Sequence, residues 1–364
     1  MLGLLIGLLT VISVITAAAQ TPAQTPAKTP AKTAAETAQD LNTQGNRVGD
    51  GGNFAEAQRL YREAIQIWRS LGPDYEAHTA GTLLNLAVAM TDDGQRPAAA
   101  KVFEEALALH RRKLGDTHHR TVSNINLLAS NYLMLGDAER AEALYREALP
   151  IERQLYPRDI QLARTLEGLS YGLVRTRQAR EALPLAEEAL GIAIQAAGED
   201  SMDTALAYSS VAEAHRAMGS GIRALPLYRK ARAIYEKALG PDHPRVASIH
   251  SQEGLILMQE GKFALAEQSM THAVKSLELA CPGCVAEIWV VENNLGLLRL
   301  QQKRYRDADA AFTRAMEVRE KLAGSNGPEL ADILQSLAVV REKERLFEDA
   351  ARLNARAAMI RTYR

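Results

Sequence analysis

The chain has 364 residues, of which 47% are hydrophobic and only 5% aromatic. This length exceeds that of one compact helical bundle and is ample for a folded core. Lys and Arg number 43, and Asp and Glu number 44. The formal net charge is therefore −1, which gives no bulk preference for nucleic acid or for an anionic membrane. Abundant alanine with few aromatic residues favours closely packed helices over strands.

Residues 1–19 are predicted to be an export signal. The run from Leu2 to Ala19 is apolar, and three alanines before Gln20 offer a cleavage site. No Lys or Arg precedes the run, and the run is nearly long enough to span a bilayer, so an uncleaved membrane anchor stays open as the alternative. In either case we expect export, to a bacterial periplasm or out of the cell.

Residues 20–37 contain recurring Thr-Pro-Ala triplets and no bulky apolar residue. Such a segment cannot bury enough surface to offset its chain entropy. The sequence therefore predicts a disordered linker, which would tether the folded part of an anchored protein to the membrane.

Residues 38–364 repeat with a period of 42 residues, and once of 41. A small residue recurs at Gly45, Ala87, Ala129, Ser170, Ala212, Gly254, Gly296 and Ala338. An alanine follows each after twelve residues, at Ala57, Ala99, Ala141, Ala182, Ala224, Ala266, Ala308 and Ala350. A second alanine follows seven residues later, at Ala64, Ala106, Ala148, Ala189, Ala231, Ala273, Ala315 and Ala357. A fixed period of this length is typical of a solenoid.

Each unit is predicted to form two antiparallel helices that flank a short turn such as "EGK", where Gly261 ends the first helix. Apolar residues follow helical spacing on both sides of this turn. The small residue on the first helix is expected to face the alanine on the second, so that the backbones approach closely. One such hairpin leaves apolar surface on both sides, and stacking onto its neighbours buries that surface. The units start near residues 38, 80, 122, 163, 205, 247, 289 and 331.

The pattern small–x6–Gly–x4–Ala–x3–aromatic–x2–Ala resembles the tetratricopeptide repeat. Its clearest copies are "LASNYLMLGDAERAEALYREAL" (128–149) and "LGLLRLQQKRYRDADAAFTRAM" (295–316). The 42-residue length and the "LGPDHP" joint look like the kinesin light chain subclass. The resemblance implies an all-α, right-handed superhelical solenoid of about eight antiparallel helix pairs, with the first helices on its concave side.

The stretch "LGPDHPRVA" (239–247) recurs in degenerate form between the units, which favours a joint over an active site. Gly240 can supply a left-handed cap, Pro241 cannot continue the helix, and Asp242 can cap the turn that follows. His243, His118 and His119 are then loop residues, because no second ligand cluster recurs at metal spacing. "GLSYG" (168–172) matches a nucleophile elbow, but Ser170 occupies the small packing position inside a predicted helix.

Cys281 and Cys284 are the only cysteines in the chain and stand in "CPGC". Thiol–disulfide redox motifs begin a helix in a βαβ fold, whereas this motif lies in a joint between units. Export and the Pro-Gly turn favour a structural disulfide. A redox role and a free or intermolecular thiol stay open as alternatives. We expect no metal and no cofactor.

The last unit departs from the pattern. Asn354 replaces the large apolar residue found at Tyr61, Phe103, Tyr145 and Phe312. A basic, polar outer face suits a capping repeat, which must be soluble on its free side. A docking surface for an acidic partner is the alternative.

The resemblance places partner-binding residues on the first helices, near each small position. The positions concerned include Asn42, Asn46, Asn85, Asn126, Arg164, Glu167, Tyr171, Glu213, Asn293 and Asn294. Arg175 and Arg216 lie nearby on the same face. A second interpretation is that the asparagines only bond neighbouring helices, because a buried amide needs partners in either case.

The sequence therefore predicts an exported, non-catalytic scaffold that binds a protein or peptide in its concave groove and does not bind nucleic acid. Two other classes stay open. One is an enzyme, hydrolytic through Ser170 or redox-active through the two cysteines. The other is a self-assembling structural protein.

Overall fold

A computed structural model describes residues 30–280, 285–323 and 328–362. These residues form sixteen α-helices and one short 3-10 helix, and no strand occurs among them. The expectation of an all-α fold is confirmed. Residues 1–29, which hold the expected export signal and most of the expected linker, and the pair Cys281 and Cys284 lie outside the described residues. No helix of the described segments is both long and apolar enough to cross a bilayer.

The helices form two compact units, an N-terminal unit that ends at Gln178 and a C-terminal unit that begins at Ala179. The boundary falls between the two helices of the fourth repeat expected from the sequence. The N-terminal unit comprises α1 (Pro30–Asp50), α2 (Phe54–Ser70), η1 (Pro73–Tyr75), α3 (Glu76–Asp92), α4 (Arg96–Leu114), α5 (His119–Leu135), α6 (Ala138–Leu155) and α7 (Ile160–Arg175).

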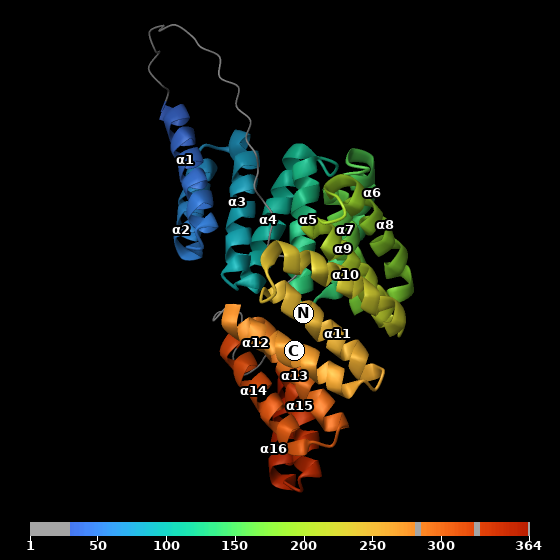
Figure 1. Ribbon diagram of the computed structural model, residues 1–364. Helices are drawn as coiled ribbons and strands as arrows, with labels where there is room; N and C mark the ends of the chain where they lie inside the picture. Colours follow the sequence, from blue (N-terminus) through green and yellow to red (C-terminus); the bar gives the residue numbers. More distant parts are fainter. Residues whose placement is uncertain (1–29, 281–284, 324–327, 363–364) are drawn as a thin grey trace. The chain divides into compact units, whose positions relative to one another are not determined.

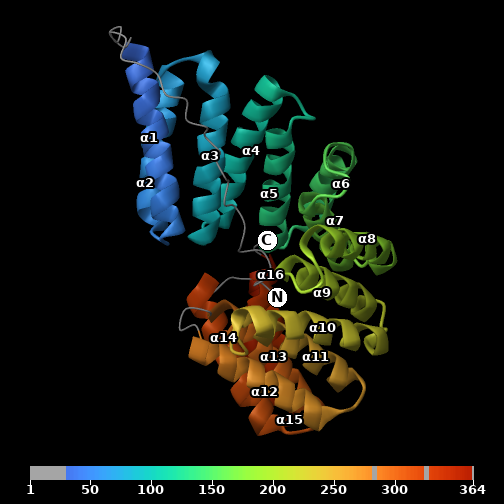
Figure 2. The ribbon, with the colours of Figure 1, turned by 45° about the horizontal axis from the view of Figure 1, so that its top comes forward.

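The C-terminal unit contains nine helices within its described residues. They are α8 (Ala179–Ala197), α9 (Met202–Ala217), α10 (Gly221–Leu239), α11 (Pro244–Gln259), α12 (Phe263–Ala280), α13 (Val285–Gln301), α14 (Tyr305–Ala323), α15 (Pro328–Lys343) and α16 (Phe347–Thr362). Within each unit every helix packs against its neighbour in chain order. Figures 1 and 2 show these neighbours running in alternating directions, as expected for stacked helical hairpins. We call the odd-numbered helices the first helices and the even-numbered ones the second helices.

The first helix begins earlier than the sequence predicted. Residues 30–37 are helical and belong to α1, although the sequence assigned them to the disordered linker. Pro30 is the last proline of the Thr-Pro-Ala segment, and proline is well suited to the first position of a helix. The alanine-rich stretch after it has a high helix propensity. The linker prediction is therefore wrong for these eight residues.

The alanine register is confirmed. All sixteen recurring alanines are buried, with at most 2% of their surface exposed. The small positions differ in detail from expectation, because they receive a large side chain rather than the alanine. A Cβ atom placed on Gly45 would lie 2.5 Å from the Tyr61 ring, and one on Gly296 would lie 2.6 Å from the Phe312 ring. The missing side chain of the first helix thus makes room for the aromatic side chain of the second.

The joint at residues 239–247 connects two helices, as the sequence predicted. Gly240 has a φ of 88° and a ψ of 159°, which is a glycine-only conformation rather than the predicted left-handed helical one. His243 caps α11, because its Nδ1 accepts a hydrogen bond of 3.1 Å from the Arg245 backbone N–H. Asp242, expected to cap the turn, instead accepts a bond of 3.1 Å from the Ser276 hydroxyl on α12.

Ion pairs join successive second helices at a spacing of 36 residues. In the N-terminal unit they run from arginine to a later glutamate, in Arg69–Glu105 and Arg111–Glu147. In the C-terminal unit they run from glutamate to a later arginine, in Glu278–Arg314 and Glu320–Arg356. These pairs are largely exposed, so each contributes at most about 1 kcal/mol. Their regular spacing means that they mark the stacking register more than they stabilise the fold.

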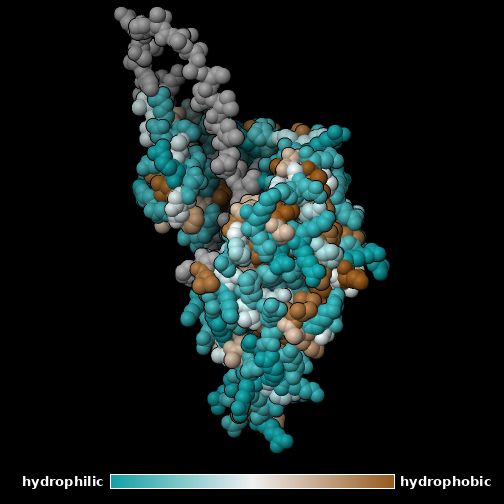
Figure 3. Space-filling view, in the orientation of Figure 1, coloured by the Kyte–Doolittle hydropathy of each residue, from teal (hydrophilic) through white to brown (hydrophobic). Residues whose placement is uncertain are grey.

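The surface of the last repeat agrees in part with the expected polar cap. The visible surface over α16 is mainly hydrophilic, and Asn354 is exposed (Figure 3). Phe347 and Met359 are nevertheless 65% and 61% exposed. The residue equivalent to Phe347 in the preceding repeat, Tyr305, packs against a core cluster that includes Leu337 of α15. Phe347 has no such cover from a further repeat among the described residues.

The buried alanines lead to a direct test of the packing. Ala266→Leu and Ala308→Leu each force three extra carbon atoms into a fully packed contact between helices. We expect each to lower the free energy of unfolding by about 1–3 kcal/mol, measured by urea denaturation. Ala264→Leu, on the exposed face of α12, is the matched control and should change stability far less. Equal stability of Ala266→Leu, Ala308→Leu and the wild type would contradict the assignment of the alanine positions.

Candidate functional site

The eight predicted partner-binding residues all lie on first helices and divide between the two units. Five belong to the N-terminal unit, namely Asn85 on α3, Asn126 on α5, and Arg164, Glu167 and Tyr171 on α7. Three belong to the C-terminal unit, namely Glu213 on α9 and Asn293 and Asn294 on α13. We describe the two groups separately and call the surface they share in each unit the first-helix face.

Asn85 connects α3 to α1. Its Nδ2 donates hydrogen bonds of 3.0 Å to Asn42 Oδ1 and 3.2 Å to Asn46 Oδ1. The Tyr61 hydroxyl on α2 donates a further bond of 2.8 Å to Asn46 Oδ1. Both N–H groups of Asn85 are therefore used between helices, so this partly exposed amide has only its carbonyl oxygen left to interact with a partner.

Asn126 makes a similar connection, but to a buried carboxylate. Its Nδ2 donates a hydrogen bond of 2.7 Å to Glu152 Oε1 on α6 and one of 2.9 Å to Thr165 Oγ1 on α7. Glu152 is only 3% exposed. Burial raises the pKa of its carboxyl group, while hydrogen bonds from Thr165 and Asn126 lower it and the charge of Asp159 raises it further. The interpretation of the asparagines as bridges between helices therefore holds for both Asn85 and Asn126.

The three predicted residues on α7 are also engaged within the protein. Glu167 is buried, and Arg164 and Tyr171 are partly buried. Each of the three has an interaction partner in the structure. Arg175, at the end of α7, is exposed. In this part of the first-helix face the charges of Arg164 and Glu167 are engaged within the protein, and Arg175 is the exposed charge.

In the C-terminal unit, Glu213 forms the centre of a compact polar group. Arg216 donates to it from Nε at 2.8 Å and also from Nη2, and the Tyr228 hydroxyl donates at 2.6 Å. The hydrogen bond to Glu213 raises the pKa of Arg216, and burial raises that of Tyr228. The Glu213–Arg216 pair is neutral overall. It therefore gives the face no net charge for attracting a charged partner.

Asn294 repeats the bridging arrangement, because its Nδ2 donates 3.2 Å to Ser251 Oγ on α11. Its neighbour Asn293 is partly buried, with no side-chain hydrogen bond to any described residue. The same first helices present a row of apolar residues, spaced by 42, at Leu255, Leu297 and Val339. Val339 is 41% exposed and the other two are partly buried. This part of the face is therefore uncharged and partly apolar.

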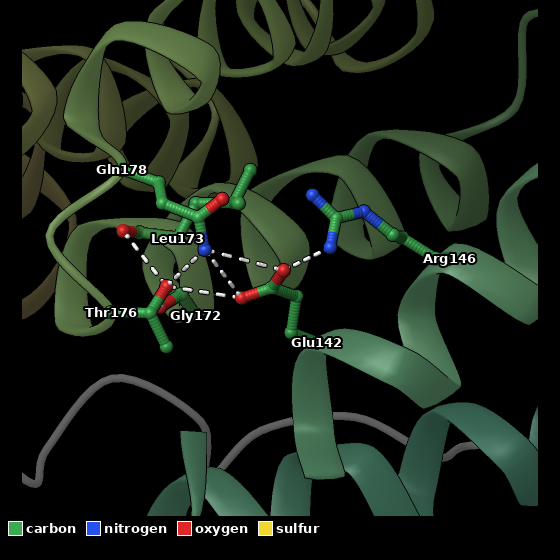
Figure 4. Close-up of polar contacts among 6 residues, drawn as sticks. All are labelled: Glu142, Arg146, Gly172, Leu173, Thr176 and Gln178. Carbon is green, nitrogen blue, oxygen red and sulfur yellow. Dashed lines mark hydrogen bonds and ion pairs between the residues drawn. The ribbon is translucent and has the colours of Figure 1, made fainter. Parts of the chain in front are cut away.

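The sequence analysis missed a recurring polar contact between repeats. Glu142 on α6 is 7% exposed and accepts hydrogen bonds from Arg146, from Thr176 Oγ1 at 3.0 Å and from Gln178 Nε2 at 3.1 Å. Figure 4 shows Arg146 on one side of this carboxylate and the turn residues Thr176 and Gln178 on the other. The contact holds the turn after α7 against the preceding repeat.

The same position recurs directly after a buried alanine in other repeats. Gln58 Nε2 on α2 donates 2.9 Å to Asp93 in the turn after α3. Glu267 on α12 pairs with Arg304 at 2.6 Å, and Asp309 on α14 pairs with Arg341 at 2.8 Å. The 42-residue spacing of a polar residue beside a core alanine was the signal in the sequence that could have identified this contact.

Ser170 and the loop histidines do not have the setting of catalytic groups, and Cys281 and Cys284 lie outside the described residues. Ser170 lies in the middle of α7 and is 1% exposed, which agrees with a packing role. His118, like His243, caps a helix, since its Nδ1 accepts 3.2 Å from the Arg120 backbone N–H. Among the described residues no group of three or more His, Cys, Asp or Glu side chains could hold a metal ion.

The bridging amides allow a comparison of two variants. Asn126→Ala removes two hydrogen bonds and leaves buried Glu152 without its closest donor, so we expect a loss of about 1–3 kcal/mol in the free energy of unfolding. Asn85→Ala acts at a partly exposed site and should cost about 0.5–1.5 kcal/mol. Urea denaturation of both proteins gives the comparison. A larger loss of unfolding free energy in Asn85→Ala than in Asn126→Ala would show that the burial of Glu152 does not determine how strongly Asn126→Ala destabilises the protein.

Comparison with known proteins agrees with this architecture. A model of the tetratricopeptide repeat matches residues 78–154, 126–195, 203–278 and 285–361, which together make up more than half of the chain. No curated protein sequence matches the chain.

Several solved structures are similar to this chain. The apo form of RapI is 16% identical and covers 78% of this chain and 98% of its own, with a TM-score of 0.64. A Rap protein in complex with Competence and Sporulation Factor is 15% identical. It covers 92% of this chain and 99% of its own, with a TM-score of 0.60. A structure of the nearly identical repeats of a kinesin light chain from Podosopora anserina is 20% identical to this chain. It covers 57% of this chain and 98% of its own, with a TM-score of 0.47. On the family match and the helix pairs, this chain belongs to the tetratricopeptide repeat family.

Proposed function

We propose that this protein is an exported, non-catalytic scaffold that binds an extended segment of a protein or peptide on its first-helix faces. The family supports a scaffold, since solenoids of this kind present extended surfaces to partners. The Rap protein in complex with Competence and Sporulation Factor is an example of a partner bound to a protein of similar fold. Helical repeats position side chains at fixed intervals, which suits recognition of a segment longer than a single pocket could hold.

The observation that carries the proposal is the state of the amides on the N-terminal unit. Asn85 and Asn126 donate both N–H groups to neighbouring helices, which fixes the orientation of each amide. The carbonyl oxygen of Asn85 is then held in place without a bond to another described residue, whereas that of Asn126 is buried. An extended segment carries one backbone N–H donor on nearly every residue. Fixed acceptors can hold such a segment at little further entropic cost.

The C-terminal unit contributes a different chemistry. Its partly exposed row Leu255, Leu297 and Val339 carries no charge, and the Glu213–Arg216 pair beside it is internally neutral. Apolar side chains of the bound segment would pack there, because burying their surface is favourable. An enzyme finds less support, since Ser170 is buried inside a helix and His118 and His243 serve as caps.

Export is the part of the proposal that depends on the sequence alone. The apolar run up to Ala19, followed by Gln20, supports cleavage of a signal, and an oxidising compartment favours a disulfide between Cys281 and Cys284. We expect protein isolated from its native cells to begin at about residue 20. Mass spectrometry should also find no free thiol. An intact N-terminus would point to the membrane anchor, and two free thiols would contradict the disulfide.

The binding proposal is tested by capturing partners with the full chain and comparing four variants. Asn46→Arg on α1 and Val339→Arg on α15 place a bulky charge on an exposed part of each first-helix face. Their controls are Gln66→Arg on α2 and Leu265→Arg on α12, which are exposed positions on second helices. For a partner identified with the wild type, we expect a first-helix variant to weaken binding about tenfold or more, equivalent to at least about 1.4 kcal/mol.

The controls should bind the same partner with nearly wild-type affinity. Equal affinity of all four variants and the wild type, with each variant folded by circular dichroism, would place binding elsewhere on the molecule. Turnover of the captured partner by the purified protein would instead support an enzyme.

A further inference from the structure

Most of the buried carboxylates among the described residues are paired with arginine. Five glutamates are buried among the described residues, namely Glu142, Glu152, Glu167, Glu253 and Glu292. Glu142 binds Arg146, Glu253 lies 3.4 Å from Arg232 Nε, and Glu292 lies 3.0 Å from Arg314 Nη1. Glu167 also has a partner within the protein. Such pairing is expected, because burying an isolated charge is costly.

Glu152 is an exception. Its bonding partners are the uncharged side chains of Asn126 and Thr165, and no basic group acts on its carboxyl group. Its second oxygen, Oε2, is buried without any hydrogen bond in the described structure. The charge that acts on its carboxyl group is that of Asp159, which is also negative and raises its pKa. The site therefore has the charge of a buried ion pair without the cation.

A second unpaired acceptor lies beside it. Asn126 Oδ1 is also buried without a hydrogen bond. Rotating the amide by 180° would not remove the unsatisfied atom, because both N–H groups already donate hydrogen bonds, one to Glu152 and one to Thr165. The two orphaned atoms, Glu152 Oε2 and Asn126 Oδ1, are thus both acceptors. They lack a donor, and a buried polar group left unsatisfied is destabilising.

The pair adjoins the first-helix face at Asn126, which is partly exposed on α5, although both orphaned oxygens are buried. Glu152 lies one hydrogen bond of 2.7 Å from this amide. A long, flexible side chain would reach both acceptors once the Asn126 side chain moves aside. Water could supply donors there, but it would leave the carboxylate charge uncompensated in a buried setting.

We infer that Glu152 and Asn126 form a binding site for a cationic N–H donor, the ammonium or guanidinium group of a lysine or arginine side chain in the bound segment. This inference rests on the proposed function and specifies the partner chemistry for the N-terminal unit. The cation would complete the ion pair that other buried glutamates make with arginines of this chain. Its N–H groups would donate to both orphaned oxygens, and its charge would hold Glu152 in the ionised form.

The test uses the full chain and three small cations as probes. n-Butylammonium and n-butylguanidinium carry N–H donors on an alkyl stem, whereas tetramethylammonium has the same charge and no N–H group. We expect the first two to raise the melting temperature in a saturable way, because a ligand that binds only the folded state stabilises it. Tetramethylammonium should not do so. The relative effects of the two donors distinguish a lysine site from an arginine site.

Two variants and the pH dependence locate the effect. Glu152→Gln should weaken binding of the better probe by about tenfold or more, because a charge-assisted bond is lost. Glu142→Gln alters a buried carboxylate that already has an arginine, so it should leave probe binding nearly unchanged. Binding requires an ionised Glu152, whose pKa is raised. Probe binding should therefore be present above that pKa and be lost as the pH falls through it.

One readout in the wild type keeps the test valid if Glu152→Gln does not fold. The carboxyl carbon-13 resonance of Glu152 should shift with n-butylammonium and not with tetramethylammonium. Equal responses to both cations, or an unchanged response in Glu152→Gln, would overturn the inference. If the first-helix variants abolish partner binding while the probes leave Glu152 unaffected, the inference fails and the proposed function stands. If the probes bind at Glu152 but the affinity for the partner is unchanged in the first-helix variants, the proposed function fails.

Discussion

The fold depends on how closely each first helix approaches its second helix. At Gly45, Gly254 and Gly296 even one added carbon would lie less than 3.0 Å from the large side chain of the second helix. The recurring alanines are buried at the same contacts. Because dispersion forces fall steeply with distance, such close backbones let alanine and aliphatic side chains fill the core with few aromatic residues. This explains how a chain with 5% aromatic residues still builds a continuous helical core.

Polar groups at the contacts between repeats follow the same periodicity. The position after a core alanine carries Gln58, Glu142, Glu267 or Asp309, and each bonds a residue of the following turn or helix. Stacked hairpins must satisfy the backbone and side-chain groups that they bury against one another. The exposed ion pairs between second helices add a charge pattern whose direction is opposite in the two units. A hairpin of one unit would therefore meet like charges if it stacked in the register of the other, which disfavours misassembly.

Glu152 does not follow this pattern of satisfied polar groups. Three of the other buried glutamates have an arginine, and the fourth is also partnered, so the chain can supply the charges that its folding requires. An uncompensated buried carboxylate beside a partly exposed amide therefore destabilises the fold without contributing to its packing. In proteins such costs are concentrated at functional sites, where a ligand supplies the missing group. This makes the region around α5, α6 and α7 chemically distinct from the rest of the N-terminal unit.

Much of the fold follows from the sequence because the determinants are local and periodic. The 42-residue register, the buried alanines and the joints at glycine all depend on residues close together in the chain or at one fixed spacing. Asn85, Asn126 and Asn294 could be located on first helices by the same register. Their partners could not, because Asn85 bonds residues 43 and 39 positions earlier and Asn126 bonds a glutamate 26 positions later.

What only the tertiary structure decided is which polar groups meet and which are left without a partner. The pairing of Glu142 with Arg146, four residues later, can be read from the sequence, but the contacts of Glu152 with Asn126 and Thr165 cannot, because these residues lie on neighbouring helices. Hydrogen bonds act over about 3 Å, so small differences in how α5, α6 and α7 pack decide whether a buried oxygen finds a donor. The sequence determined the helices and their repeat, and the packing of neighbouring repeats determined the chemistry of the face that they share.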